Sequence, residues 1–169
     1  MNKNLSQKGF TLIELLIVIV IIATLAVTVF VALNPAQRLK DSKDARRTAD
    51  VDSILTAIHA AIVDNKGAYP TAFGTPPLLE TQLGTGVAGV CSPLVNALSG
   101  CSVAASTACI NPMVGAINLT KYLKSLPIDP TGGTTFDATK TGYTVAIDVN
   151  GIVTVRACGA EVTGASSSR

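Results

Sequence analysis

The sequence contains no tryptophan, few aromatic residues and a single histidine, His59. Aromatic residues make up 4% of the chain and charged residues 14%, whereas an ordinary soluble domain has roughly 25% charged residues. No Ser/His/Asp set, metal-ligand cluster or phosphate-binding loop accompanies the histidine, so no catalytic constellation is visible. We therefore expect a protein that is not an enzyme, and a length of 169 residues suggests one domain.

The excess of positive charge is small and lies at the start of the chain. Lysine and arginine number 13 and aspartate and glutamate 11, giving a net charge of +2. Two of the positive residues, Lys3 and Lys8, precede Gly9, so the rest of the chain carries equal numbers of both signs. Without a basic field to attract phosphates, we expect no nucleic-acid partner.

Hydrophobic residues make up 48% of the sequence, and many of them form one run near the start. Residues 10–33 form this run, and residues 15–33 contain only two polar side chains, both threonine. At about 1.5 Å per residue, a helix over this run is long enough to cross a membrane core of about 30 Å. Lys3 and Lys8 precede the run, so the positive-inside rule predicts a cytoplasmic N-terminus and an extracytoplasmic remainder.

Glu14 is the one acidic residue inside the apolar run. A carboxylate at membrane depth costs at least about 2.5 kcal/mol, so it needs a compensating partner. A cleaved secretory signal has a shorter apolar core, of about 7–15 residues. It also ends in a cleavage site of small residues, and no clean site of this kind closes the apolar run here. A plain single-span anchor fits the length but leaves Glu14 unexplained.

The stretch around this carboxylate reads Lys8-Gly9-Phe10-Thr11-Leu12-Ile13-Glu14-Leu15. It resembles the N-terminal signal of type IV pilins and type II secretion pseudopilins. The resemblance implies that a prepilin peptidase cuts between Gly9 and Phe10 on the cytoplasmic side. It also implies N-methylation of the new N-terminal Phe10, and a role for Glu14 in assembling the mature chains into a helical filament.

Charge pairing gives this processing a physical reason. Cleavage would create a positive amine on Phe10 that can form a hydrogen-bonded ion pair with the Glu14 carboxylate. The two residues are four apart, so the pair can form within one chain or between neighbouring chains, and the resemblance favours the second. The family extracts subunits with an assembly platform and a cytoplasmic ATPase; the absence of a Walker motif here predicts a separate motor protein.

Beyond the apolar run, Asn34-Pro35 either bends one long helix, which we favour, or ends it and starts another. Residues 34–66 are predicted to continue the helix in amphipathic form. Nine of the fifteen residues over 38–52 are charged, with both signs interleaved. This segment is interpreted as a solvated helix face, with charge complementarity between neighbouring subunits as the alternative.

The middle of the chain carries weaker signals. Gly67-Ala68-Tyr69-Pro70 resembles the Gly-x-Tyr-Pro that often ends the long helix in pilins and pseudopilins. Residues 71–117 are rich in small residues and proline, with short helical turns expected near 78–82 and 94–98. A short helix over 118–126, capped by its first asparagine, is expected after them.

All four cysteines, Cys91, Cys101, Cys109 and Cys158, follow the apolar run. An even number on one side of a membrane suggests two disulfides in an oxidising compartment. A metal site is the rival interpretation, but no Cys-x-x-Cys pair occurs and His59 is distant in sequence. We expect a bond between Cys91 and Cys101 and another between Cys109 and Cys158, while the three possible connectivities stay open.

Leu126-Pro127-Ile128-Asp129-Pro130 resembles the Leu-Pro-x-Asp-Pro that precedes the sheet in many pseudopilins. The major pseudopilins often hold calcium in a loop beyond it. The acidic residues available here are Asp129, Asp137 and Asp148, and their spacing does not match a calcium loop. We expect no cofactor, with calcium as the alternative.

Residues 143–148 and 152–157 alternate apolar and polar side chains, which is typical of two half-buried strands. A three-residue loop over 149–151, with its glycine left-handed, pairs Ile147 with Val153 and keeps one face apolar. A two-residue turn would mix the faces.

The apolar face is expected to pack on a helical stripe formed by Ile54, Ile58 and Ile62. Phe136 is expected to begin a third strand, and residues 159–169 are interpreted as a flexible tail.

These patterns predict an α+β, pilin-like fold in which one long N-terminal helix packs on a small antiparallel sheet of two to three strands. The expected divisions are a leader (1–9), a membrane and filament-core helix (10–33), its amphipathic continuation (34–66), a disulfide-stapled head (67–158) and the tail (159–169). The expected function is that of a structural subunit of a pilus or pseudopilus. The alternative is a minor pilin acting as an adhesin or a DNA-binding module.

Overall fold

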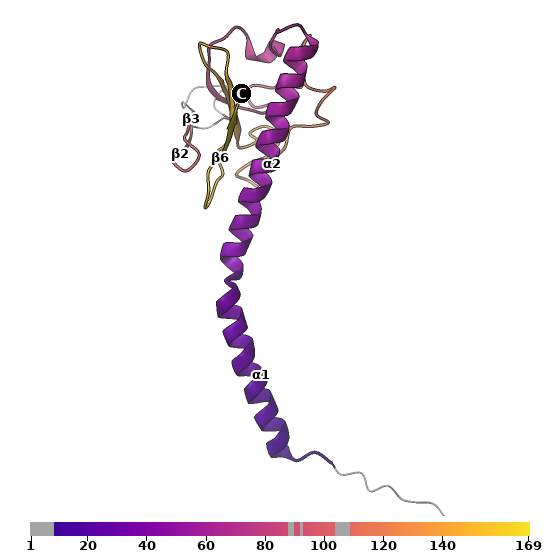
Figure 1. Cartoon of the computed structure of the whole chain (residues 1–169), viewed down its shortest axis with the longest axis vertical. Helices are drawn as coiled ribbons and strands as arrows, with labels where there is room; N and C mark the ends of the chain where they lie inside the picture. Colours follow the sequence, from indigo (N-terminus) through magenta and orange to yellow (C-terminus); the bar gives the residue numbers. More distant parts are fainter. Residues whose placement is uncertain (1–8, 88–89, 92, 104–108) are drawn as a thin grey trace, which may run out of the picture. The chain divides into compact units, whose positions relative to one another are not determined.

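The computed structural model describes residues 9–87, 90–91, 93–103 and 109–169. The chain divides into two compact units, Met1–Leu39 and Lys40–Arg169. Apart from Gly9, the expected leader lies outside the described residues. The fold is α+β and pilin-like: a long N-terminal helical run is followed by antiparallel strands (Figure 1).

The first helix, α1 (Leu12–Leu33), is apolar around its whole circumference, and none of its residues is buried. A helix of this kind suits lipid, where all backbone polar groups must be paired internally. Among the described residues, the helical run Leu12–Asp64 is the one stretch with the length and composition of a membrane span, and its most apolar 18-residue window has a mean hydropathy of 3.2.

The helical run is interrupted at a single residue, Asn34. Asn34 has φ 38° and ψ 69°, in the left-handed region, and forms the C-cap of α1. Its carbonyl accepts hydrogen bonds from the backbone N–H of Gln37 (3.0 Å) and Arg38 (3.2 Å). Pro35 lies in the first turn of α2 (Pro35–Asp64), where its missing N–H costs no helical hydrogen bond. The helical run is therefore interrupted at Asn34 and resumes at Pro35, which is closer to the alternative of two successive helices than to the favoured bend within one helix.

Within the second unit, one face of α2 packs on a sheet. Ile54 and Ile58 on the helix share a core with Val145 and Val155 on the sheet, and each of these side chains is at most 1% exposed. Ile62 lies at the margin of this core and is partly buried. The predicted docking of the isoleucine stripe on the apolar sheet face is confirmed.

The main sheet has four antiparallel strands in the order β1-β4-β5-β6. Its strands are β1 (Leu78–Gln82), β4 (Tyr143–Ile147), β5 (Val153–Ala157) and β6 (Ala165–Ser168). A separate two-stranded sheet joins β2 (Leu94–Asn96) to β3 (Cys101–Val103), and a short 3-10 helix, η1, spans Thr71–Phe73. The sheet is thus larger than the two to three strands expected from the sequence.

The β4–β5 hairpin has the predicted register. Val145 pairs with Val155 and Ile147 with Val153, so both apolar pairs share the face that meets α2. Gly151 has φ 83°, a conformation that a side chain would disfavour. The hairpin prediction is confirmed, including its left-handed glycine.

Two segments expected as helical turns are strands instead. Residues 78–82 form β1, which pairs with the free edge of β4, and residues 94–96 form β2, which pairs with β3. Segments this short cannot sustain a helix alone, and the long-range backbone partners decide their conformation.

Three further expectations were also wrong. Phe136 lies in a turn, because β1 already occupies the edge of β4 that a strand there would need. Residues 118–126 form only a turn, with hydrogen bonds from Tyr122 and Leu123 N–H to the Leu119 carbonyl. Residues 159–169, expected as a flexible tail, contain β6, which pairs with β5 along its length.

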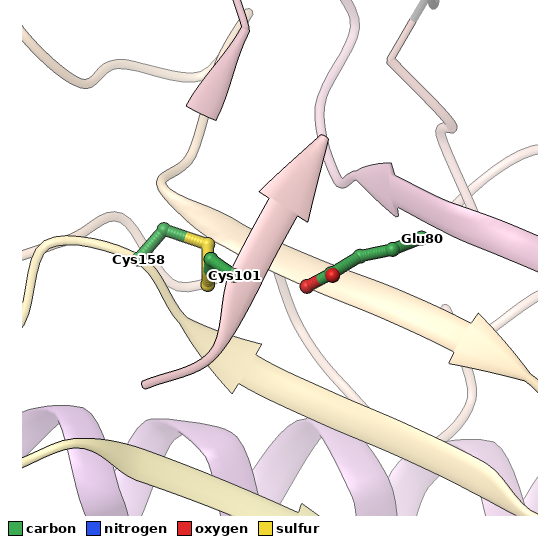
Figure 2. Close-up of side chains that lie close together, drawn as sticks. All are labelled: Glu80, Cys101 and Cys158. Carbon is green, nitrogen blue, oxygen red and sulfur yellow. A yellow bond between two sulfur atoms is a disulfide. The ribbon is translucent and has the colours of Figure 1, made fainter. Parts of the chain in front are cut away.

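The disulfides join Cys91 to Cys109 and Cys101 to Cys158. The expected connectivity was therefore wrong. Cys101 lies on β3, and Cys158 directly follows β5, so the second bond ties the small hairpin to the main sheet (Figure 2). Sequence spacing did not reveal this, because it depends on where β3 lies over the sheet.

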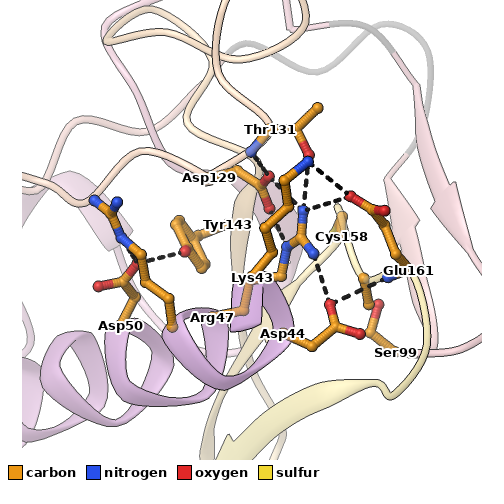
Figure 3. A network of polar contacts seen from close by, with 12 residues as sticks. Lys43, Asp44, Arg47, Asp50, Ser99, Asp129, Thr131, Tyr143, Cys158 and Glu161 are labelled. Atoms are coloured by element: carbon orange, nitrogen blue, oxygen red, sulfur yellow. Dashed lines mark hydrogen bonds and ion pairs between the residues drawn. The ribbon is translucent and has the colours of Figure 1, made fainter. Parts of the chain in front are cut away.

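A buried ion cluster, formed by Asp44, Arg47 and Asp129, joins α2 to the loop that precedes β4 (Figure 3). The Arg47 guanidinium donates through Nε to Asp129 Oδ2 (2.7 Å), through Nη2 to Asp129 Oδ1 (2.8 Å) and through Nη1 to Asp44 Oδ1 (2.6 Å). The three side chains are at most 3% exposed. Nη2 also donates to the Thr131 hydroxyl (2.8 Å). Part of the charged segment 38–52 is therefore neither solvated nor free for neighbouring subunits.

Asp44 is also the acceptor for three consecutive backbone N–H groups. Its carboxylate receives hydrogen bonds from Glu161 (3.2 Å), Val162 (2.7 Å) and Thr163 (2.9 Å). Burial by itself would raise the pKa of Asp44, but the hydrogen bonds from Thr163, Arg47, Glu161 and Val162 outweigh it and lower this pKa. The cluster thereby fastens the C-terminal segment to α2.

Replacing Ile58 with alanine should lower the free energy of unfolding by about 2–5 kcal/mol, because it leaves a cavity in the helix–sheet core. Urea unfolding of the full chain in detergent micelles, followed by tyrosine fluorescence, measures this loss. Thr56→Ala, on the exposed face of the same helix, should change stability by less than about 0.5 kcal/mol. Equal effects of the two substitutions would contradict the assigned core.

Lowering the pH should destabilise the second unit, Lys40–Arg169, because Asp44 then becomes protonated. Its folded pKa lies below the ordinary value of 3.8, so its contribution is complete above that pH and is lost as pH falls through the folded pKa. The free energy of unfolding should therefore drop between about pH 5 and pH 2, and Asp44→Asn should flatten this drop. At neutral pH, Asp44→Asn should cost about 1.5–3 kcal/mol. An unchanged pH profile in the variant would contradict this assignment.

Candidate functional site

The Gly9-Phe10 junction lies just before α1 and outside any regular element. The Phe10 side chain is 91% exposed. Among the described residues, no atom lies within 4 Å of the position that a β-carbon on Gly9 would occupy. The peptide bond between the two residues is thus in an open stretch of chain that a protease active site can surround.

Thr11 and Glu14 form a capping box at the start of α1. Thr11 has an extended backbone (φ −82°, ψ 151°), and its hydroxyl accepts the Glu14 N–H (3.3 Å). In return, Glu14 Oε2 accepts the Thr11 N–H (2.8 Å) and the Thr11 hydroxyl (2.9 Å). The reciprocal contacts satisfy backbone donors that a helix start otherwise leaves unpaired, and they fix where α1 begins.

The capping box uses one of the two Glu14 carboxylate oxygens. Both Thr11 contacts go to Oε2, and within the described part of the chain Oε1 has no hydrogen-bond donor. Oε1 can therefore still accept a hydrogen bond, while Oε2 keeps the carboxylate fixed to its own helix. A carboxylate oxygen of this kind in an apolar segment is suited to bind a cation or a strong hydrogen-bond donor from another molecule.

Sequence reasoning assigned a role to Glu14 but missed that of Thr11. The signal was present, because a threonine followed three residues later by a glutamate, just before an apolar run, is the pattern of a capping box.

The three aspartates considered for calcium serve different local structures. Asp129 belongs to the buried ion cluster. Asp137 accepts from the Thr139 hydroxyl and from the backbone of Thr139 and Lys140, and these bonds lower its pKa. Asp148 accepts backbone N–H groups from Ile152 and Asn150, which lower its pKa in the same way. Asp137 and Asp148 thus have their partners within their own loops, whereas Asp129 is bound by Arg47 of α2.

Among the described residues, the group of side chains close enough to share a metal ion consists of Glu80, Cys101 and Cys158, and it includes none of these aspartates (Figure 2). The two sulfur atoms are bonded to each other and offer no thiolate. Glu80 accepts from the Thr144 hydroxyl (2.7 Å) and the Ser102 N–H (3.0 Å). In the disulfide-bonded chain, these atoms therefore stabilise the outer face of the sheet.

Comparison with known proteins gives one match, at the N-terminus. Residues 4–30 match the family model described as the prokaryotic N-terminal methylation motif. No curated protein and no solved structure matches the chain significantly. The matched segment contains the Gly9-Phe10 junction, the Thr11–Glu14 capping box and most of α1. This chain therefore carries the prepilin signal of the type IV pilins and pseudopilins.

Proposed function

We propose that the chain is a structural subunit of a type IV pilus or a type II secretion pseudopilus, made as a precursor and assembled from the cytoplasmic membrane. The observation that carries the proposal is the methylation motif placed on an open junction and followed at once by an apolar helix without buried residues. A structural role also fits the buried ion cluster, in which Arg47 is paired with Asp44 and Asp129.

Processing would begin at the exposed junction. A prepilin peptidase on the cytoplasmic side of the membrane would cut between Gly9 and Phe10, and the new amine of Phe10 would then be N-methylated. Methylation of an amine keeps its positive charge, so the mature N-terminus stays a suitable partner for a carboxylate.

Assembly would use the acceptor that the capping box leaves open. Glu14 Oε1 would receive the amine of Phe10 from a neighbouring subunit, while Oε2 stays on Thr11 and preserves the helix start. Two charges that are each costly in lipid would thereby neutralise each other. Before cleavage the Phe10 nitrogen is a neutral amide, so this pairing would be specific for processed subunits.

The exposed surface of α1 would supply the filament core. Ile22, Leu25, Ala26 and Val29 line an apolar groove along the helix, and small residues such as alanine allow close helix approach. A subunit leaving the bilayer would expose this surface to water unless neighbours covered it at the same time. Extraction would therefore be coupled to polymerisation, with the assembly platform and the cytoplasmic ATPase as partners.

The mature chain should begin at Phe10 and carry one added methyl group. Mass spectrometry of the natural product should show the loss of the first nine residues and the mass of a single methylation on the new N-terminal peptide. Detection of the Met1 end in assembled filaments would contradict the proposed processing.

Glu14→Leu should leave cleavage intact but lower filament yield at least tenfold, a factor that corresponds to about 1.4 kcal/mol per contact. Sheared filaments quantified against total processed subunit give the yield. Thr24→Leu is the matched control, because it also replaces a polar side chain of α1 whose hydroxyl bonds only its own helix, at Ile21 O. Normal yield from Glu14→Leu, or an equal loss in both variants, would contradict the charge-pairing role.

A further inference from the structure

The segment after Cys158 lies against two carboxylates of the ion cluster, and one of them, Asp44, is hydrogen-bonded to it. We define residues 159–169 as the C-terminal strap. At its start the Asp129 carboxylate lies so close to Gly159 that a β-carbon there would overlap it. Beginning two residues later, Asp44 accepts the N–H groups of Glu161, Val162 and Thr163. Both carboxylates are in turn held by Arg47, which comes from α2 (Figure 3).

A second polar contact fixes Cys158 from the side of the small hairpin. The Asn96 side-chain amide donates to the carbonyls of Cys158 (2.8 Å) and Ala160 (3.0 Å). Asn96 lies on β2 directly opposite Cys101 on β3. The residue that binds the Cys158 backbone is therefore the cross-strand neighbour of the cysteine to which Cys158 is bonded.

These contacts together determine where the Cys158 sulfur lies. The Cys158 N–H bonds the Gly142 carbonyl (2.9 Å), Asn96 holds its carbonyl, and the ion cluster holds the strap that follows. The resulting Cα–Cα distance to Cys101 is 5.7 Å, within the usual range for a disulfide. None of these contacts uses the Cys158 sulfur.

We propose that four positioning residues select the Cys101–Cys158 pairing by holding the reduced Cys158 beside Cys101. These residues are Asp44, Arg47 and Asp129 of the ion cluster, and Asn96. Four cysteines allow three connectivities, and the chosen one joins residues 57 positions apart. The polar contacts remove the conformational freedom that would otherwise let Cys158 meet Cys91 or Cys109.

The chemistry is ordinary thiol–disulfide exchange with a disulfide oxidant. One thiolate attacks the oxidant and forms a mixed disulfide, releasing one oxidant thiol. The partner thiolate then displaces the second oxidant thiol and closes the bond. Two electrons pass to the oxidant and two thiol protons are released or transferred to it. The positioning residues take no part in these transfers and raise only the chance that the second attack comes from the native partner.

The other disulfide provides a control within the same molecule. Cys91 Sγ lies near the carbonyls of Gly86 and Thr139, and the Cys109 N–H bonds the Gly86 carbonyl (3.1 Å). In the described residues, neither cysteine contacts the ion cluster or Asn96. A loss of positioning should therefore affect one bond and spare the other, whereas a general loss of stability should weaken both.

The test is redox equilibration of the full chain in detergent micelles. The chain is equilibrated with mixtures of reduced and oxidised dithiothreitol, free thiols are alkylated, and each bond is quantified by mass spectrometry. Trypsin leaves Cys158 on the peptide that follows Arg156 and the other three cysteines on the peptide 67–121, so the bonded share of Cys158 is read directly. Fragmentation of the linked peptides identifies its partner.

In Asp44→Asn and in Asn96→Ala, the equilibrium constant for Cys101–Cys158 should fall about tenfold, as expected for loss of a hydrogen bond to a charged or buried group. The constant for Cys91–Cys109 should stay unchanged in Asn96→Ala. In Asp44→Asn, which also lowers the stability of the folded unit, it should fall by much less than the constant for Cys101–Cys158. In both variants a larger share of Cys158 should appear in other pairings. Asp52→Asn, at an exposed position of α2, should leave both bonds at the wild-type level.

Two outcomes would overturn the proposal: an unchanged Cys101–Cys158 constant in both variants, or an equal fall for both bonds. If Asp44→Asn prevents folding, Asn96→Ala decides alone, because Asn96 lies on the small hairpin outside the helix–sheet core. The test does not depend on filament formation, so its result is separate from that of the proposed function.

Discussion

A carboxylate in an apolar helix must have partners, and this requirement governs the N-terminal part of the chain. Glu14 receives two hydrogen bonds from Thr11 on one oxygen, which makes the residue part of its own helix start. The other oxygen is left for a contact outside the helix. Within the part of the chain that the structure describes, the same helix has no buried residue. One carboxylate oxygen and an apolar helix surface are therefore both available to a neighbouring subunit, which is the physical reason for proposing an oligomeric filament.

In the second unit, Lys40–Arg169, the charges of the buried ion cluster are paired with one another. A buried guanidinium is costly unless its donors are matched, and Arg47 has carboxylates on both sides and a hydroxyl as well. Removing one member would leave the others buried without compensation, so the cluster acts as a unit. The cluster joins α2, the loop that precedes β4 and the C-terminal strap. It therefore holds together three segments that are distant in sequence.

Sequence patterns predicted the elements whose signals are local. The apolar run gave α1, and the alternation in 143–157 gave the hairpin with its register, because a shift by one residue would have buried Arg156 on the core face. The patterns failed for segments whose conformation is determined by pairing with residues far along the chain. Residues 78–82 became a strand because the edge of β4 was free, and residues 165–168 did so because β5 had an open edge.

The functional and buried polar residues also divide into those that a local motif predicts and those that only the tertiary structure reveals. Gly9, Phe10 and Glu14 lie in one contiguous motif and could be named from the sequence, and the Thr11 contact could have been named as well. The ion pair of Arg47 with Asp129 spans 82 positions, and no spacing rule links them. The disulfides were missed for a related reason, since the placement of β3 over the sheet is a tertiary property.

The single left-handed residue between the two helices also limits how far helical order can spread. Helix growth proceeds one hydrogen bond at a time, and Pro35 has no N–H with which to continue the series from α1. Because Asn34 has a left-handed conformation, we expect fraying that starts in one helix to be checked there, so that each helix melts and re-forms as its own segment. A chain built this way can lose order near its apolar end without transmitting that loss into the folded head.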